Sequence, residues 1–175
     1  MLDFLNLQNW RDVARSIGLI VWQSRFYATP RLVHAALSPS TERMVLFVCV
    51  ENTFRSILSE AIFNAHAPPG WRAESAGVQP ATEINPLAVE LLSEVGIHIA
   101  GKTPRLVTRD MVSRAWRVVT FGCLDRCPIG AEGKAEDWQV PTSTGKSAQE
   151  LRAIRDELSK RVLSLIEEIK RLPSP

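Results

Sequence analysis

The hydrophobic and polar positions follow two alternating patterns from residue 44 onward. Short segments at 44–48, 71–76 and 116–121 have the length of strands, and the first and third are dense in apolar and β-branched residues. The longer stretches between and after them repeat apolar residues at helical spacing. Helices that alternate with strands in this way predict an α/β domain built on a parallel sheet with right-handed crossovers.

Capping residues mark the ends of the shorter helices. Asn85 is a suitable N-cap for a helix that begins at Pro86, and Gly96 stands where a C-terminal glycine is common. The apolar face of this helix is predicted to consist of Leu87, Val89, Leu91, Leu92 and Val95. Another short helix is expected to be capped at residues 108–110 and to end at Ala115.

The longest helix is expected near the C-terminal end, from about Ala148 to Arg171. Its predicted buried stripe consists of Leu151, Ile154, Leu158, Val162, Leu165, Ile166 and Ile169. The charged residues of this helix, Arg155 among them, are expected on a solvated face.

Residues 1–43 are interpreted as an N-terminal extension and linker, and residues 44–175 as one domain long enough to bury a sizeable core. Apolar residues at 7, 10, 14 and 17 can share one face of a helix, and two Pro-containing breaks follow at 29–30 and 38–40. A basic amphipathic arm can bind a membrane surface or a partner. A solvated or self-packed arm is the simpler interpretation.

Composition narrows the classes of function. The chain has 21 basic and 19 acidic residues, and a net charge of +2 is too small to indicate nucleic-acid binding. No apolar stretch approaches the roughly 20 residues of a membrane span, so we expect no membrane association. Three cysteines and no recognisable secretory signal favour the reducing cytoplasm, where thiols stay available for chemistry.

The most informative motif is Cys49–Arg55 followed by Ser56, at the turn from the first strand into the first helix. Free backbone N–H groups and the helix dipole favour a thiolate there, and the planar fork of Arg55 suits a tetrahedral oxyanion. Ser56 can donate its hydroxyl to the sulfur, and the Asn52 side chain can hold the loop curved. The residues predicted to surround the oxyanion are Val50, Glu51, Asn52, Thr53, Phe54 and Arg55.

A structural interpretation of this motif is also available. Cys is a common core residue, and Arg55 could simply solvate the start of a helix. The strand before the motif, the helix after it and Ser56 favour the catalytic interpretation.

The segment Phe47-Val48-Cys49 through Arg55-Ser56 resembles the nucleophile loop of the low-molecular-weight protein tyrosine phosphatase superfamily, which includes the thioredoxin-coupled arsenate reductases. Further similar segments follow in the family's order: Ser75-Ala76-Gly77, Asn85-Pro86-Leu87-Ala88, Val95-Gly96-Ile97, Val118-Val119-Thr120, Asp137-Trp138 and Gly145-Lys146. The resemblance covers about residues 44–169. It implies a three-layer sandwich with a four-stranded parallel sheet of strand order 2-1-3-4, and no cofactor.

A second chemical motif is the run Gly122-Cys123-Leu124-Asp125-Arg126-Cys127-Pro128 after the third strand. Parallel strands carry such loops at one edge of the sheet, so Cys123 and Cys127 are expected near Cys49. No second Cys pair exists to complete a zinc site and the three histidines have no metal-ligand spacing, so we expect no metal.

The second motif resembles the relay segment of arsenate reductases. In such a relay, Cys123 would attack the Cys49 adduct, Cys127 would attack Cys123, and thioredoxin would reduce the last disulfide. Two inert, partly buried cysteines are the alternative interpretation.

Two positions near the nucleophile depart from the family pattern. Family members usually carry Asp-Pro four and five residues after a Trp in the last active-site loop, and this Asp is the general acid. Here Thr142-Ser143 follow Trp138 at that distance. Asp125 or Asp137 is then the candidate general acid, or catalysis is slow on esters with poor leaving groups. Glu51 replaces a usual Gly and is expected either to point to solvent or to select a less charged or unusual substrate.

Three functions fit these residues. The first is reduction of arsenate or a similar oxyanion through a relay of Cys49, Cys123 and Cys127, with thioredoxin as electron donor. The second is hydrolysis of phosphotyrosine or another phosphomonoester through a phosphocysteine at Cys49, although the paired aromatic residues of the phosphotyrosine pocket are not seen. The third is a catalytically weak, phosphate-binding homologue. Arsenate reduction is the leading hypothesis.

Overall fold

The structure is a computed structural model and describes residues 42–127, 131 and 133–172. Almost all of the predicted extension at residues 1–43 lies outside this range, so the predicted helix there and the boundary after residue 43 stay predictions. In the part of the chain that the structure describes, no helix has both the length and the apolar character needed to cross a membrane.

A four-stranded sheet forms the centre of the domain. Its strands are β1 (Arg43–Cys49), β2 (Trp71–Gly77), β3 (Ala115–Thr120) and β4 (Ala135–Asp137). All neighbouring strands are parallel and the order is β2-β1-β3-β4, which confirms the predicted topology. The three strands predicted from the pattern are correct to within one residue at each end. β4 has no apolar pattern of its own, so only the family resemblance implied it.

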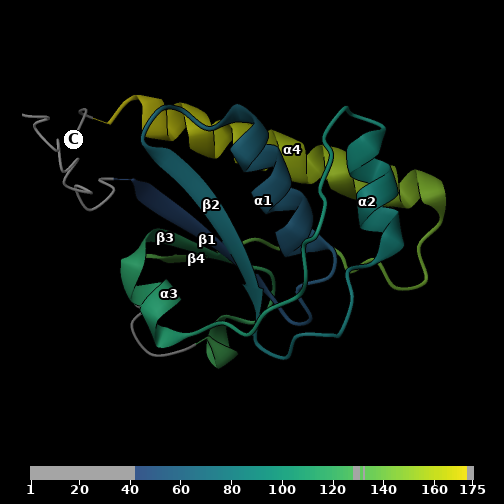
Figure 1. Cartoon of the computed structure of the whole chain (residues 1–175), viewed down its shortest axis with the longest axis horizontal. Coiled ribbons are helices and arrows are strands. Elements are labelled where there is room, and N and C mark those ends of the chain that lie inside the picture. The colour runs from purple at the N-terminus through teal and green to yellow at the C-terminus, as the bar shows by residue number, and fades with distance from the viewer. Residues whose placement is uncertain (1–41, 128–130, 132, 173–175) are drawn as a thin grey trace, which may run out of the picture. The chain divides into compact units, whose positions relative to one another are not determined.

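Helices cover both faces of the sheet. The α-helices of the described chain are α1 (Arg55–His66), α2 (Pro86–Ser93), α3 (Arg109–Arg114) and α4 (Ala148–Lys170). α1, α2 and α4 lie on one face and α3 lies on the other, which gives the three predicted layers (Figure 1). The predicted caps are confirmed, because the side chains of Asn85 and Thr108 accept hydrogen bonds from the backbone two and three residues ahead, at 3.0 and 3.2 Å.

Helix α4 packs on α1 through the apolar stripe that the sequence predicts. All seven residues of this stripe are buried. The prediction for Arg155 is wrong, because this residue is only 9% exposed. Its guanidinium pairs with Glu94 at 2.7 Å and with Asp156 at 2.8 Å. It also donates to the carbonyl of Leu91, so a buried charge links α4 to α2.

The predicted apolar face of α2 is only partly correct. Leu91 and Leu92 are buried, but Leu87, Val89 and Val95 are 40%, 37% and 48% exposed. α2 has only 8 residues and contacts the domain through one narrow stripe. Apolar residues outside that stripe therefore remain in contact with water, as isolated apolar residues on protein surfaces often do.

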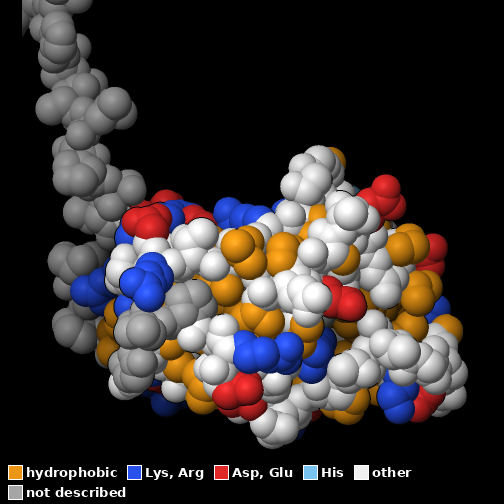
Figure 2. Space-filling model, turned by 90° about the horizontal axis from the view of Figure 1, so that it is seen from below, with side chains coloured by type: hydrophobic (Ala, Val, Ile, Leu, Met, Phe, Trp, Pro, Cys, Tyr) orange, Lys and Arg blue, Asp and Glu red, His pale blue; other side chains and the backbone are white. Residues whose placement is uncertain are grey.

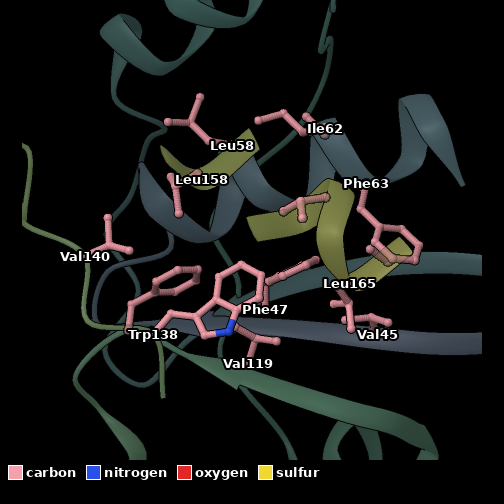
Figure 3. Close-up of a cluster of buried hydrophobic side chains, with 14 of the residues drawn as sticks. Val45, Phe47, Leu58, Ile62, Phe63, Val119, Trp138, Val140, Leu158 and Leu165 are labelled. Atoms are coloured by element: carbon pink, nitrogen blue, oxygen red, sulfur yellow. The ribbon is translucent and has the colours of Figure 1, made fainter. Parts of the chain in front are cut away.

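The core between the sheet and the helices α1 and α4 is centred on Phe47 of β1. Phe47 is fully buried, and its ring lies 6.2 Å from the ring of Phe63, 6.5 Å from Phe121 and 6.0 Å from Trp138. Figure 3 shows Phe47 and Trp138 beside each other, together with aliphatic side chains from the helices. The rings hold the ends of β1 and β3 together, from which the two chemical motifs extend.

Charges are mixed on the side of the molecule that carries α3. Figure 2 shows small groups of Lys and Arg side chains there, each with Asp or Glu nearby, and apolar side chains between them. Among the described residues, this face has no continuous basic patch of the kind that binds nucleic acid.

Gly77 ends β2 and lies against the loop that follows β1. A Cβ atom at this position would lie 2.6 Å from the carbonyl oxygen of Val50 and 3.0 Å from the amide nitrogen of Asn52. Both are backbone atoms, so they cannot swing away as the end of a flexible side chain can. The close approach of two backbone segments therefore requires glycine here.

We expect Gly77→Ala to lower the free energy of unfolding by about 1–3 kcal/mol, because the added methyl group forces the loop at 50–52 or the end of β2 to move. Urea unfolding followed by circular dichroism measures this change. An unchanged unfolding midpoint would contradict the close approach.

The start of α4 carries a capping box. Ser147 accepts a hydrogen bond from the amide of Glu150 at 3.3 Å, and the Glu150 carboxylate accepts one from the amide of Ser147 at 2.8 Å. The hydrogen bond from the Ser147 backbone, followed by that from Lys146, lowers the pKa of Glu150 from 4.5 to about 2. The carboxylate therefore stabilises the fold above pH 4.5, and this contribution is lost as the pH falls toward 2.

Glu150→Gln is expected to lower the urea midpoint at neutral pH, and the difference from the wild type should shrink at about pH 3, where the unfolded chain already binds the proton. Paired urea titrations at the two pH values measure it. Glu90→Gln is the control, because the described residues offer the Glu90 carboxylate no hydrogen bond or ion pair. A Glu150→Gln difference that does not change with pH would contradict the prediction.

Candidate active site

The loop between β1 and α1 begins with Cys49 and ends with Arg55. Cys49 is buried, and its sulfur accepts a hydrogen bond from the amide of Asn52 at 3.2 Å. The Ser56 hydroxyl lies 3.0 Å from the same sulfur. Both groups can donate to a thiolate, so the loop stabilises the reactive form of a nucleophile.

Asn52 holds the curvature of this loop. It is fully buried and has a φ of 56°, a left-handed conformation that Asn adopts more readily than most residues. Its side-chain amide donates to the hydroxyls of Ser56 and Ser75, both at 2.9 Å. Its side-chain oxygen accepts from the amide of Arg105 at 3.0 Å. This geometry agrees with the role predicted for Asn52.

The hydrogen bonds continue behind the loop to a buried carboxylate. Ser75 donates to Glu60, and Lys102 pairs with the other oxygen of Glu60. Glu60 is only 7% exposed. Sequence reasoning missed this network, although Glu60 stands among the apolar positions of α1 between Ile57 and Ile62. A charge there requires a buried partner, and that requirement was a usable signal.

The guanidinium of Arg55 is held by residues from outside the nucleophile loop. One of its terminal nitrogens donates to the carbonyl of Val140 at 3.0 Å, and its guanidinium carbon lies 5.8 Å from the centre of the Phe121 ring. The remaining donors of the fork are left for an oxyanion. Val140 and Phe121 come from distant parts of the chain, and no sequence signal identified either as a partner.

A pocket of about 160 Å³ lies at this loop. It is lined by Cys49, Val50, Glu51, Thr53, Phe54 and Arg55 on one side and by Thr142, Ser143 and Thr144 on the other. Five of the six residues predicted to surround the oxyanion therefore line it. Asn52 is the exception, because it is buried and acts through its hydrogen bonds. The pocket is large enough for a single tetrahedral oxyanion.

Glu51 occupies its position without backbone strain. Asn52 is the only non-glycine residue of the described chain with a positive φ, so Glu51 does not need the conformation that favours glycine. Its side chain is exposed, yet it lines the pocket. The expectation that Glu51 is open to solvent is confirmed, and its effect on substrate selection stays a prediction.

Cys123 and Cys127 lie beyond β3, in and beside a short 3-10 helix (Leu124–Arg126). The Cys123 thiol is fully buried and donates to the carbonyl of Val48, the neighbour of Cys49, at 3.4 Å. Burial raises the pKa of Cys123, and the negative charges of Cys49 and Asp137 add to this effect. Cys127 is partly exposed. The sheet thus brings Cys123 close to the nucleophile, as the sequence predicts.

Neither candidate general acid lines the pocket. The Asp137 carboxylate accepts hydrogen bonds from the hydroxyl of Thr120, from the amide of Gly122 at 2.8 Å and from the side chain of Gln139. It therefore links β4 to the turn after β3. Asp125 is exposed on the 3-10 helix. Their roles as acid stay predictions without geometric support. Thr142, which stands where the family pattern predicts an Asp, lines the same pocket as Cys49.

The described residues include no group of three or more His, Cys, Asp or Glu side chains that could hold a metal ion. The ring of His66 bonds to the carbonyl of Ile62 at 2.9 Å, and His98 is exposed. His34 lies outside the described residues.

Comparison with known proteins agrees with this geometry. The sequence profile of the low molecular weight phosphotyrosine protein phosphatase family matches residues 44–125. An arsenate reductase from Staphylococcus aureus is 32% identical over 122 residues, which cover 67% of this chain and 92% of that relative.

Solved structures are similar as well. A thioredoxin-dependent arsenate reductase from Corynebacterium glutamicum superposes with a TM-score of 0.65 at 34% identity. The match covers 75% of this chain and 64% of that one, which is less than two thirds of its length. An arsenate reductase in a phosphate-binding state has a TM-score of 0.66 at 28% identity, with 73% of this chain and 98% of that one covered.

The nucleophile loop, the order of the strands and the relatives point in the same direction. The chain belongs to the low-molecular-weight phosphotyrosine protein phosphatase superfamily, an enzyme superfamily that includes the arsenate reductases.

Proposed function

We propose that this chain reduces arsenate to arsenite through a relay of Cys49, Cys123 and Cys127, with thioredoxin as the electron donor. The observation that carries the proposal is the placement of Cys123, whose thiol donates to the carbonyl next to Cys49. The simplest phosphatase mechanism needs no second thiol beside the nucleophile.

The first step belongs to the nucleophile loop. The Cys49 thiolate attacks arsenic, an arsenic–sulfur bond forms and one arsenic–oxygen bond breaks. The leaving oxygen takes a second proton from the substrate and departs as water. Arg55 and the backbone amides of the loop hold the remaining oxygens. The hydrogen bonds from Asn52 and Ser56 keep the sulfur in position for this attack.

The next steps move electrons through sulfur. Cys123 attacks the Cys49 sulfur, the two sulfurs form a disulfide, and the electron pair of the arsenic–sulfur bond leaves with arsenic, which becomes arsenite. Cys127 then attacks Cys123, which releases Cys49 and leaves a Cys123–Cys127 disulfide. A dithiol donor reduces this last disulfide and is itself oxidised. Cys127 is partly exposed whereas Cys123 is buried, so a protein donor such as thioredoxin reaches Cys127 more readily.

Phosphotyrosine hydrolysis is the weaker hypothesis. The pocket has about 160 Å³, and its wall opposite the loop consists of Thr142, Ser143 and Thr144 rather than aromatic side chains. Such a pocket suits a free oxyanion better than a phenyl phosphate. No carboxylic acid on that wall can protonate a phenolate leaving group.

We expect Cys123→Ser and Cys127→Ser each to abolish arsenate reduction, because either change breaks the path of electrons out of Cys49. The measurement is arsenate-dependent NADPH oxidation with thioredoxin and thioredoxin reductase. Hydrolysis of p-nitrophenyl phosphate is the internal control, since it requires Cys49 alone and should survive both changes. Cys49→Ser should abolish both activities. Full NADPH oxidation in Cys123→Ser would exclude the relay.

Thr142→Asp is expected to increase hydrolysis of phenyl phosphate by about tenfold or more, because it places a general acid opposite Cys49. The increase should be much smaller for p-nitrophenyl phosphate, whose leaving group needs little protonation. Steady-state kinetics on the two esters measure the difference, and Thr142→Asn is the matched control without an acidic proton. Equal increases on both esters would mean that position 142 does not serve the leaving oxygen.

A further inference from the structure

Glu51 gives the pocket an unusual charge. Of the described residues that line it, Cys49, Glu51 and Arg55 are titratable or charged, and Thr142, Ser143 and Thr144 on the opposite wall are neutral. Glu51 is thus the only residue with a carboxylate among the described residues that line the pocket. A second negative group accompanies the nucleophile, in a site built to bind an anion.

The Glu51 carboxylate is not neutralised within the described structure. It is exposed, and no described residue forms a hydrogen bond or ion pair with it. Arg55, the one cation among the described residues that line the pocket, donates to Val140 and packs on the ring of Phe121, and it forms no ion pair with Glu51. An anion that enters the pocket therefore experiences the negative charge of Glu51, screened by water, together with the positive charge of Arg55.

We infer that Glu51 shifts the selectivity of this pocket toward the singly charged form of its tetrahedral oxyanion and away from the doubly charged form. Repulsion grows in proportion to the charge of the ligand. For a carboxylate several Å from the ligand, at a dielectric between that of a protein surface and that of water, each unit of charge weakens binding by about three- to tenfold. The doubly charged form suffers this effect twice.

Because Thr142 stands where a general acid is expected, the singly charged form of arsenate is also the better reactant. The Cys49 thiolate and singly charged dihydrogen arsenate give a doubly charged arsenic adduct on the Cys49 sulfur and one molecule of water. The arsenic–sulfur bond forms, one arsenic–oxygen bond breaks, and a proton of the substrate moves to the leaving oxygen. Doubly charged hydrogen arsenate carries only one proton. To give the same adduct, its leaving oxygen would have to depart as hydroxide, which departs less readily than water. The substrate thus supplies the proton that Thr142 cannot supply.

Binding of inorganic phosphate tests the charge selection without turnover. The comparison uses Cys49→Ser protein, which has no thiol among the described residues of the pocket lining, with and without Glu51→Gln, and Glu90→Gln in the same background as the control. Calorimetry at about pH 6 and about pH 8 samples the two charge forms of the ligand. Glu51→Gln should tighten binding at both values, and the gain should be about three- to tenfold larger at the higher pH. Glu90→Gln should change neither affinity.

An equal gain at both pH values, or no gain, would overturn the inference. Absence of phosphate binding to Cys49→Ser protein at both pH values would overturn it together with the oxyanion site.

Turnover separates charge selection from a direct catalytic role of Glu51. In protein with all three cysteines, charge selection predicts that Glu51→Gln raises kcat/KM for arsenate and p-nitrophenyl phosphate at about pH 8 by several-fold. If Glu51 were itself the general acid, the same change would lower kcat/KM, and most strongly for phenyl phosphate. A decrease would therefore contradict the inference.

The identity of arsenate as the reactant rests on the proposed function, but the charge selection does not. If the wild type consumed no NADPH with arsenate and the phosphate affinities still followed the expected pattern, the proposed function would fail and the selection by Glu51 would stand.

Discussion

The hydrogen bonds of the Asn52 side chain are the interaction on which the rest of the site depends. This buried amide joins the nucleophile loop to β2 through Ser75 and to the segment before α3 through the amide of Arg105. The backbone of Asn52 adopts a left-handed conformation, and its backbone N–H donates a hydrogen bond to the Cys49 sulfur. In a buried site these bonds are strong and leaving one unmade is costly, so the loop has one stable shape.

The shape of the nucleophile loop also requires the end of β2 to lie directly against the loop backbone, with no side chain between them. Gly77 allows the end of β2 to touch the backbone of the loop at residues 50–52. On the face of the sheet that α1 and α4 cover, Phe47 packs against Phe121 and Trp138. Phe121 in turn lies under the guanidinium of Arg55. The aromatic core thus continues into the candidate oxyanion site, and the stability of the fold and the position of Arg55 rest on the same contacts.

How far the sequence predicted this site depends on the distance along the chain between the interacting residues. Cys49, Asn52, Arg55 and Ser56 lie within one strand-loop-helix turn, so their spacing alone identified them. The position of Cys123 beside β1 followed from the rule that parallel strands place their loops at one edge. Partners such as Val140 and Lys102 act across long separations and left no local pattern. The prediction for Arg155 was wrong for the same reason, because its partner Glu94 lies far away in the sequence, just after the end of α2.

The two buried cysteines lie in different hydrogen-bonding environments. The Cys49 sulfur accepts a hydrogen bond from the Asn52 amide and lies 3.0 Å from the Ser56 hydroxyl. Cys123 instead donates to the carbonyl of Val48, and burial raises its pKa, so it rests as a thiol. The negative charge of Cys49 strengthens this effect. In the proposed relay, Cys123 must therefore lose this proton before it attacks the Cys49 sulfur.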